Sequence, residues 1–222
     1  CKAPLASKTR LRPGFFVLRI AVAFGFSFVY ADLNHRKEFS MALLIAGVLL
    51  WTLAHLFKRW FPHARAQLGS AGRGIIAIAI VASLVLMIVG YGHAQGDVLW
   101  VAGGNWLLVS HGLSLFALYL MAASAGKTWI TSKVAHPQLT AVKSWSVGHL
   151  LINGDVQSLI LFGGLLAWAA LSVAVINRQD GKPSPVVTVN ALNEVVTAVA
   201  AMLAFGVIAF IHIALGYTVY LP

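Results

Sequence analysis

The chain has 222 residues, of which 59% are hydrophobic and only 10% are charged. A soluble domain carries roughly a quarter charged residues, so this composition indicates a protein whose surface meets lipid. Sixteen Lys and Arg against six Asp and Glu give a net charge of +10, but the charges stand in short runs between apolar stretches. That pattern is typical of membrane topology signals and not of nucleic-acid binding. Cys1 is the single cysteine, which excludes an internal disulfide, a Cys-rich metal site and a thioether-bound haem.

Seven apolar segments follow one another, separated by charge clusters, Gly and Pro. Their expected ranges are 14–31, 41–57, 74–91, 99–125, 137–153, 156–177 and 195–221. Most are close to the ~20 residues that a helix needs to cross a ~30 Å hydrocarbon core, and the second and fifth are a little short. None shows the alternating pattern of barrel strands, and backbone polar groups in lipid must be satisfied within each segment. The sequence therefore predicts an all-α, polytopic transmembrane helix bundle.

The first segment differs from the others because Arg19 interrupts it. An Arg at the centre of a span costs about 2.5–3.5 kcal/mol on insertion scales, unless it lies near one end and snorkels. Whether this segment crosses the membrane stays open. We therefore divide the chain into residues 1–40, an N-terminal extension that could add a seventh helix, and residues 41–222, a six-helix transmembrane domain.

Charged residues between the segments orient the bundle. The loops after the second, fourth and sixth segments are basic, whereas the loops between them carry Asp97 and Asp155 and neither Lys nor Arg. The basic residues are Lys58, Arg59, Arg65, Arg73, Lys127, Lys133, Arg178 and Lys182. By the positive-inside rule these three loops face the cytoplasm, so both ends of the six-helix domain are expected on the opposite side.

Histidines supply most of the chemistry inside the apolar segments. The sequence offers no paired intramembrane carboxylates, no phosphate-binding Gly loop and no Ser or Cys nucleophile beside a His. Four histidines, His55, His111, His149 and His212, fall within the segments, where an ionisable side chain is costly. Imidazole is a common ligand of metals and of haem iron. One such His more often makes a helix–helix hydrogen bond, but four in a small bundle favour a cofactor site.

The depth of each histidine along its helix limits which pair could bind one iron. Counted from the loops, His111, His149 and His212 lie in the outer halves of their segments, and His55 lies toward the inner end. At 1.5 Å per residue, His55 and His149 would differ in depth by roughly 10–15 Å, which is awkward for two axial ligands of one haem. Depth alone therefore favours His111 or His212 as the partner of His149.

Two tryptophans precede candidate histidines by four residues, Trp51 before His55 and Trp145 before His149. This spacing places each indole on the same helix face as the imidazole, one turn away. Such rings could form the wall of a flat cofactor site, or they could simply pack the core.

The stretch from His136 to Asp155, HPQLTAVKSWSVGHLLINGD, is the most distinctive part of the chain. It predicts a helix that starts at a Pro and ends at Asn153-Gly154, with Asp155 as the N-cap of the next helix. Lys143 lies near the middle of this helix. Its ammonium must snorkel, pair, or meet a cofactor carboxylate such as a haem propionate.

This stretch and the SLILFGGLLAW that follows, together with LAHLFKRWFP and FIHIALGY, resemble the NnrU family of bacterial membrane proteins from about Met41 to Pro222. The family includes, as more distant relatives, the plant and cyanobacterial zeta-carotene isomerases. The resemblance implies a haem b between the helices, with His149 and His55 as ligands, in a bacterial inner membrane. We therefore expect His149 as the first ligand and His55 as the second, with His111 and His212 as reserve candidates. It also implies either a cis–trans isomerase-like role on a hydrophobic polyene (a carotenoid) or a role in nitrogen-oxide respiration (denitrification). Ala135 stands where the family pattern often has Arg.

Two functions of different classes remain at this point. In the first, the protein is a haem-b enzyme or redox protein of the lipid bilayer. In the second, it is a haem-free membrane factor that supports assembly or expression of a partner complex, and its histidines are structural. The absorption spectrum of the purified protein discriminates between them, since a Soret band requires haem.

Overall fold

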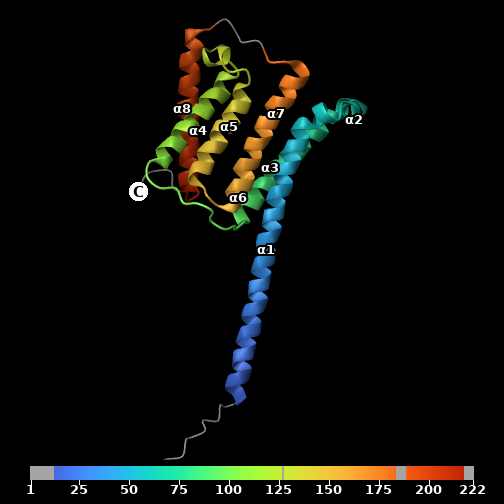
Figure 1. The fold of residues 1–222 in the computed structure, drawn as a ribbon, viewed down its shortest axis with the longest axis vertical. Coiled ribbons are helices and arrows are strands. Elements are labelled where there is room, and N and C mark those ends of the chain that lie inside the picture. The colour runs from blue at the N-terminus through green and yellow to red at the C-terminus, as the bar shows by residue number, and fades with distance from the viewer. Residues whose placement is uncertain (1–12, 127, 184–188, 218–222) are drawn as a thin grey trace, which may run out of the picture.

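The computed structural model describes residues 13–126, 128–183 and 189–217, with side chains from His35 onward. Regular structure in these residues is entirely helical (Figure 1), which confirms the predicted fold class. The α-helices are α1 (Pro13–Trp60), α2 (Pro62–Gln67), α3 (Gly72–His93), α4 (Trp106–Ala123), α5 (Pro137–Ile152), α6 (Val156–Ser158), α7 (Gly164–Asp180) and α8 (Ala191–Ala214). A π-helical turn, Leu159–Gly163, joins α6 to α7.

Within the described residues, five helical stretches are long and apolar enough to cross a membrane. They are His35–Trp60, Gly69–His93, Trp106–Ala123, Val156–Asp180 and Ala191–Ala214. The remaining core helix, α5, has only 16 residues and packs between α4 and α7 (Figure 1). The expected six-helix domain thus consists of five helices that are long and apolar enough to cross a membrane and the shorter α5, which runs alongside them from one end of the bundle to the other. The protein is an integral membrane protein, and its environment is the lipid bilayer.

The expected break between segments 14–31 and 41–57 is wrong, because α1 continues from Pro13 to Trp60 without interruption. The intervening DLNHRKEFS contains neither Gly nor Pro, the residues that end helices most effectively. With 48 residues, α1 is about 70 Å long, more than twice the ~30 Å of a hydrocarbon core. Its N-terminal half extends well beyond the bundle (Figure 1). Segment 14–31 is therefore the first part of α1 and not a separate helix.

The expected helix at 99–125 is also too long at its start, because α4 begins only at Trp106. The preceding residues form a loop in which the backbone N–H groups of Leu99 and Trp100 donate to Gly154 O over 2.6 and 3.1 Å. Gly104 in this loop has φ +63°, a left-handed conformation that glycine adopts without strain. Hydropathy alone does not separate such an apolar loop from the first turns of a helix.

The last expected segment, 195–221, is shifted in the structure. Its helix α8 begins at Ala191, after the side chain of Asn190 accepts a hydrogen bond from Leu192 N. The helix ends at Ala214. Residues 218–221 of the expected segment lie outside the described residues.

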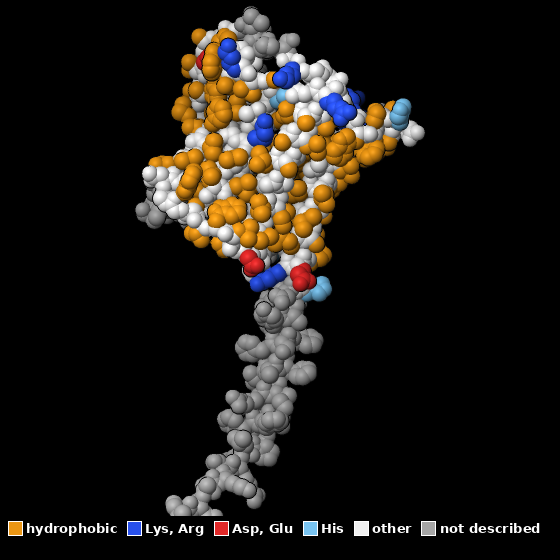
Figure 2. Space-filling model, viewed as in Figure 1, with side chains coloured by type: hydrophobic (Ala, Val, Ile, Leu, Met, Phe, Trp, Pro, Cys, Tyr) orange, Lys and Arg blue, Asp and Glu red, His pale blue; other side chains and the backbone are white. Residues whose placement is uncertain are grey.

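Most of the Lys and Arg side chains visible in Figure 2 lie toward the top of the bundle, although some lie at its lower end beside acidic side chains. We call the upper end the basic end. Its residues are Lys58, Arg59, Arg65, Arg73, Lys133, Arg178 and Lys182, from α1, α2, α3, α7 and the loops beside them; Lys127 lies outside the described residues. At the opposite end, the far end, the loops of Asp97 and Asp155 meet, since Val156 N donates to Asp97 O over 3.1 Å. That the basic end faces the cytoplasm, as the positive-inside rule predicts, stays a prediction.

The helices pack closely on one side of the bundle and leave a cavity on the other. α1 and α3 approach so closely that a Cβ added to Gly90 would lie 2.5 Å from Leu44 N. The main buried cluster lies among α1, α3 and α7, and a smaller one joins α4 to α5. By contrast, α8 packs mainly against α4. A cavity remains where α8 would otherwise meet α5.

Candidate functional site

A cavity of about 720 Å³ lies among α4, α5 and α8. Ligand-binding pockets in proteins typically measure about 300–1,000 Å³. Three of the four intramembrane histidines line it, each from a different helix: His111 of α4, His149 of α5 and His212 of α8. Most other lining side chains are aliphatic or aromatic. The structure therefore brings together the three histidines for which depth along the helices suggested a common site.

His149 and His212 share one hydrogen-bonding arrangement. Nδ1 of His149 lies 3.0 Å from the backbone oxygen of Trp145, and Nδ1 of His212 lies 2.8 Å from that of Ile208. A carbonyl oxygen only accepts, so Nδ1 of the neutral imidazole carries the proton and Nε2 keeps its lone pair. Metal-bound histidines usually donate their other ring N–H in this way. Both imidazoles are thus prepared to bind a metal through Nε2.

His111 differs from these two histidines. Its ring contacts Phe205 of α8 edge to face, with the ring centroids 5.7 Å apart. Within the described part of the chain it has no hydrogen bond, so neither ring nitrogen is fixed as the protonated one. His111 is therefore less well prepared as a metal ligand than His149 or His212.

An aromatic wall supports the imidazole of His149. The ring stacks on Phe162, with centroids 4.5 Å apart at 29°, and it contacts Trp145 at 4.8 Å. The contact with Trp145 is the one that the four-residue spacing predicts. Phe162 belongs to the π-helical turn between α6 and α7, a type of turn that occurs frequently at functional sites. No local sequence pattern indicates Phe162, because the π-helical turn that changes the helical register is not visible in the sequence.

The turn after α5 fixes the end of the helix that carries His149. As predicted, α5 ends just before Asn153-Gly154, and the Asp155 side chain accepts a hydrogen bond from Ser158 N over 2.7 Å. Asn153, which also lines the cavity, donates from Nδ2 to His149 O over 3.0 Å. The sequence indicated a helix turn here, but not that Asn153 itself contacts the site.

His55 is not among the residues that line this cavity. Its Nδ1 lies 2.9 Å from Trp51 O, and its ring packs against Trp51 and Trp168, with centroid distances of 4.1 and 4.9 Å. It lies five residues before the basic end of α1, whereas His149 lies three residues before the far end of α5. Trp51 and His55 therefore form a separate aromatic cluster with Trp168 between α1 and α7.

Lys143 is half-buried on α5 and does not line the cavity. It precedes His149 by six residues, which places it about 240° around the helix axis from that histidine. The described residues provide it with no hydrogen bond or ion pair. A contact between Lys143 and a cofactor carboxylate stays a prediction.

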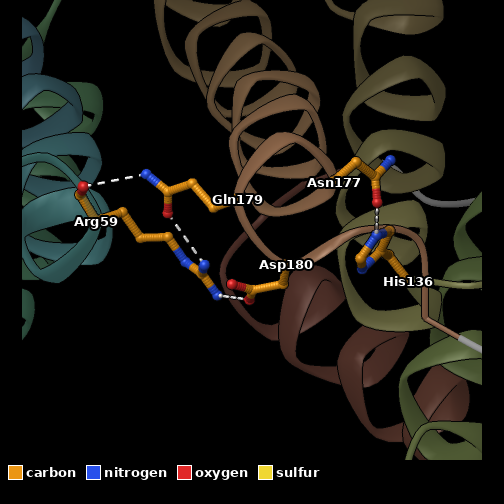
Figure 3. Close-up of polar contacts among 5 residues, drawn as sticks. All are labelled: Arg59, His136, Asn177, Gln179 and Asp180. Atoms are coloured by element: carbon orange, nitrogen blue, oxygen red, sulfur yellow. Dashed lines mark hydrogen bonds and ion pairs between the residues drawn. The ribbon is translucent and has the colours of Figure 1, made fainter.

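Polar contacts at the basic end join α1, α5 and α7 (Figure 3). His136 Nε2 lies 2.8 Å from Asn177 Oδ1, and Arg59 forms an ion pair with Asp180 at 2.7 Å. Gln179 both accepts a hydrogen bond from Arg59 Nη1 and donates one to Arg59 O. These contacts hold the helices together at the basic end, away from the cavity. His136 therefore has a hydrogen-bond partner, Asn177, and does not line the cavity.

The donor set of the cavity suits haem iron better than a bare metal ion. Among the described residues, no three His, Cys, Asp or Glu side chains are placed to hold a metal ion together. A porphyrin supplies four nitrogens itself, so its iron needs only one or two axial ligands from the protein. Two imidazoles with free Nε2 lone pairs in an apolar, aromatic cavity fit that requirement.

No curated protein and no solved structure matches this chain. The family model described as "NnrU protein" matches residues 43–219, which include every histidine of the cavity and almost all of the bundle. Because this match covers most of the chain, the protein belongs to the NnrU family.

Proposed function

We propose that this protein binds one haem b in the cavity among α4, α5 and α8, with His149 as the first iron ligand and His212 as the second. The observation that carries the proposal is that two intramembrane histidines from different helices line one cavity, each with Nδ1–H bound to a carbonyl of its own helix. Both imidazoles are only partly exposed, and an ionisable side chain within an apolar helix is costly in a membrane unless a partner satisfies it.

Depth supports His212 as the second ligand over His55. His149 lies three residues before the end of α5, and His212 lies two residues before the end of α8. Both helices end at the far end of the bundle (Figure 1), so the two imidazoles lie at similar depth. His111, five residues after the start of α4, has a similar depth, but its ring nitrogens lack the carbonyl contact that orients a ligand.

The surrounding residues would position the haem and exclude water. Phe162 and Trp145 hold the His149 ring from two sides and limit its rotation. A bound haem would supply iron that accepts or donates an electron, and this iron would polarise a substrate only when one of the two axial histidines is displaced. Of the two roles that the family suggests, we propose the isomerase-like one, because an apolar intramembrane cavity suits a hydrophobic polyene better than a charged substrate such as nitrite.

The experiment is absorption spectroscopy of the detergent-purified protein after titration with haemin, with the pyridine derivative used to identify haem b. We expect a Soret band in the wild type, loss of most bound haem in His149→Ala, and a shifted spectrum in His212→Ala. His136→Ala is the matched control, since this histidine bonds Asn177 outside the cavity. Circular dichroism checks that each variant is still folded.

Each contrary outcome has a distinct meaning. A folded His149→Ala variant with wild-type haem content and spectrum refutes the ligand assignment. If the haem spectrum shifts in His55→Ala and stays unchanged in His212→Ala, the second ligand is His55 instead. If the wild type binds no haem, the alternative function, a haem-free membrane factor that supports a partner complex, becomes the better hypothesis.

A further inference from the structure

The half of α8 nearest the basic end is fixed to the bundle. Glu194, in its first turn, accepts hydrogen bonds from Tyr119 Oη over 2.9 Å and from the backbone N–H of Trp129. One carboxylate thus ties α8 to both α4 and the loop that follows α4. Thr197 and Ala201, the two buried residues of α8, also lie in this half.

The other half of α8, residues 202–214, has much weaker support from protein. None of its residues is buried. Where it would meet α5, the cavity intervenes, and this half contributes four lining residues: Phe205, Ile208, Ala209 and His212. The contrast with α3 is clear, because α3 has buried residues, Met87 and Gly90, close to its far end.

The outward face of this half is apolar. Met202, Leu203 and Phe210 are 57%, 66% and 70% exposed, and in a bilayer such side chains contact hydrocarbon. Among the five candidate spans, α8 has the smallest buried share, 11% against 17–33% for the others. If residues 202–214 move outward, the cavity therefore opens to the bilayer interior and not to water.

From these three observations we propose that α8 is a lateral gate of the cavity. Its first half is the fixed part, held by Glu194 and Thr197, and residues 202–214 form the moving wall. A hydrophobic, membrane-dissolved ligand enters past this wall, and the bound ligand then supplies the packing surface that residues 202–214 otherwise lack. The proposal rests on the proposed function in one respect, namely that the cavity is a ligand site.

A reversible crosslink across the gate tests this proposal. The rings of His111 and Phe205 are 5.7 Å apart, so Cys residues at these two positions are within reach of a short bis-methanethiosulfonate reagent. The double variant His111→Cys/Phe205→Cys is made together with Cys1→Ser, which removes the natural thiol. It keeps both proposed iron ligands, His149 and His212. The full-length protein in phosphatidylcholine nanodiscs is crosslinked either before or after loading with haemin.

Crosslinking before loading is expected to slow haemin uptake at least tenfold, and crosslinking after loading is expected to slow haem release to the same degree. Reduction with dithiothreitol should restore both rates. The matched control is Gly126→Cys/Thr197→Cys, where a Cβ on Gly126 would lie 3.8 Å from Thr197 Oγ1 in the fixed half. A crosslink there should leave both rates unchanged.

The outcomes separate the gate from the haem site. Equal uptake with and without the His111–Phe205 crosslink overturns the gate and leaves the haem site standing. If the uncrosslinked protein takes up no haemin, the proposed function fails. In that case, hydrogen–deuterium exchange of the haem-free protein still tests the gate. If residues 202–214 form a moving wall, their backbone amides should exchange at least tenfold faster than those of residues 191–201. Equal exchange in the two halves overturns it.

Discussion

Replacing Gly154 by Ala should destabilise the loop that ends the His149 helix. A Cβ at Gly154 would lie 1.9 Å from the backbone oxygen of Trp100 and 2.7 Å from its carbonyl carbon. Both atoms belong to the backbone, so a side-chain rotation cannot relieve the contact. The 98–101 loop must move away, and the hydrogen bonds from Leu99 N and Trp100 N to Gly154 O are then weakened.

The size of this effect follows from two contributions. Overpacking at a tight site costs about 1–3 kcal/mol, and each of the two weakened hydrogen bonds contributes about 1 kcal/mol. Allowing for partial relaxation, we expect Gly154→Ala to lower the free energy of unfolding by about 2–4 kcal/mol. For a chain of this length, that corresponds to a decrease in melting temperature of roughly 5–15 °C.

The assay is thermal unfolding in detergent, followed by circular dichroism. Gly92→Ala is the matched control, because a Cβ on Gly92 meets nothing within 4 Å, and Ala in a helix is more stable than Gly by about 0.5–1 kcal/mol. We expect that control to melt at or slightly above the wild-type temperature. A Gly154→Ala variant that melts within a degree or two of the wild type would refute the steric argument and the role of this loop in fixing α5.

Three further predictions concern charge. Lys143→Met keeps the side-chain volume and removes the ammonium, so it should weaken haem retention if Lys143 pairs with a propionate. Haem transfer to apomyoglobin measures this retention, and an unchanged transfer rate would mean that the ammonium snorkels. A periplasm-active reporter fused after Pro222 should be active and a cytoplasm-active one silent, because the positive-inside rule places the basic end in the cytoplasm; the reverse result would invert the bundle. Arg59→Ala should lower the free energy of unfolding by no more than about 1 kcal/mol, because the side chains of Arg59 and Asp180 are 28% and 57% exposed. A loss of several kcal/mol in chemical denaturation would show that this ion pair stabilises the fold more than an exposed pair does.

Sequence alone predicted the features of the fold that depend on local composition. Hydropathy located the spanning helices, and the turn residues located the end of α5 and the cap at Asp155. It did not predict that α1 is continuous, because a polar stretch with neither Gly nor Pro fits both a loop and a helix. It also assigned Leu99 and Trp100 to a helix, although their N–H groups bond Gly154, a residue more than fifty positions away.

The candidate site shows the same division between local and distant information. The pairing of Trp145 with His149 follows from a four-residue spacing, and the structure contains that contact. Counting residues from the helix ends favoured His111 or His212 as the neighbour of His149, although the family resemblance ranked His55 before them. His111, His149 and His212 line one cavity, and His55 does not. The choice between His111 and His212 required atomic positions, since it depends on which Nδ1 meets a carbonyl oxygen.

The length of α5 explains why the cavity lies where it does. With 16 residues, this helix is about 24 Å long, shorter than a ~30 Å hydrocarbon core. Its last residue, Ile152, and the following Asn153 both line the cavity, so the chain reverses beside the cavity. His149 is consequently held within one turn of a helix end in the bundle, where Asn153 caps its carbonyl and Phe162 covers its ring. The short helix and its turn therefore lie beside the cavity and fix the imidazole of His149 that lines it.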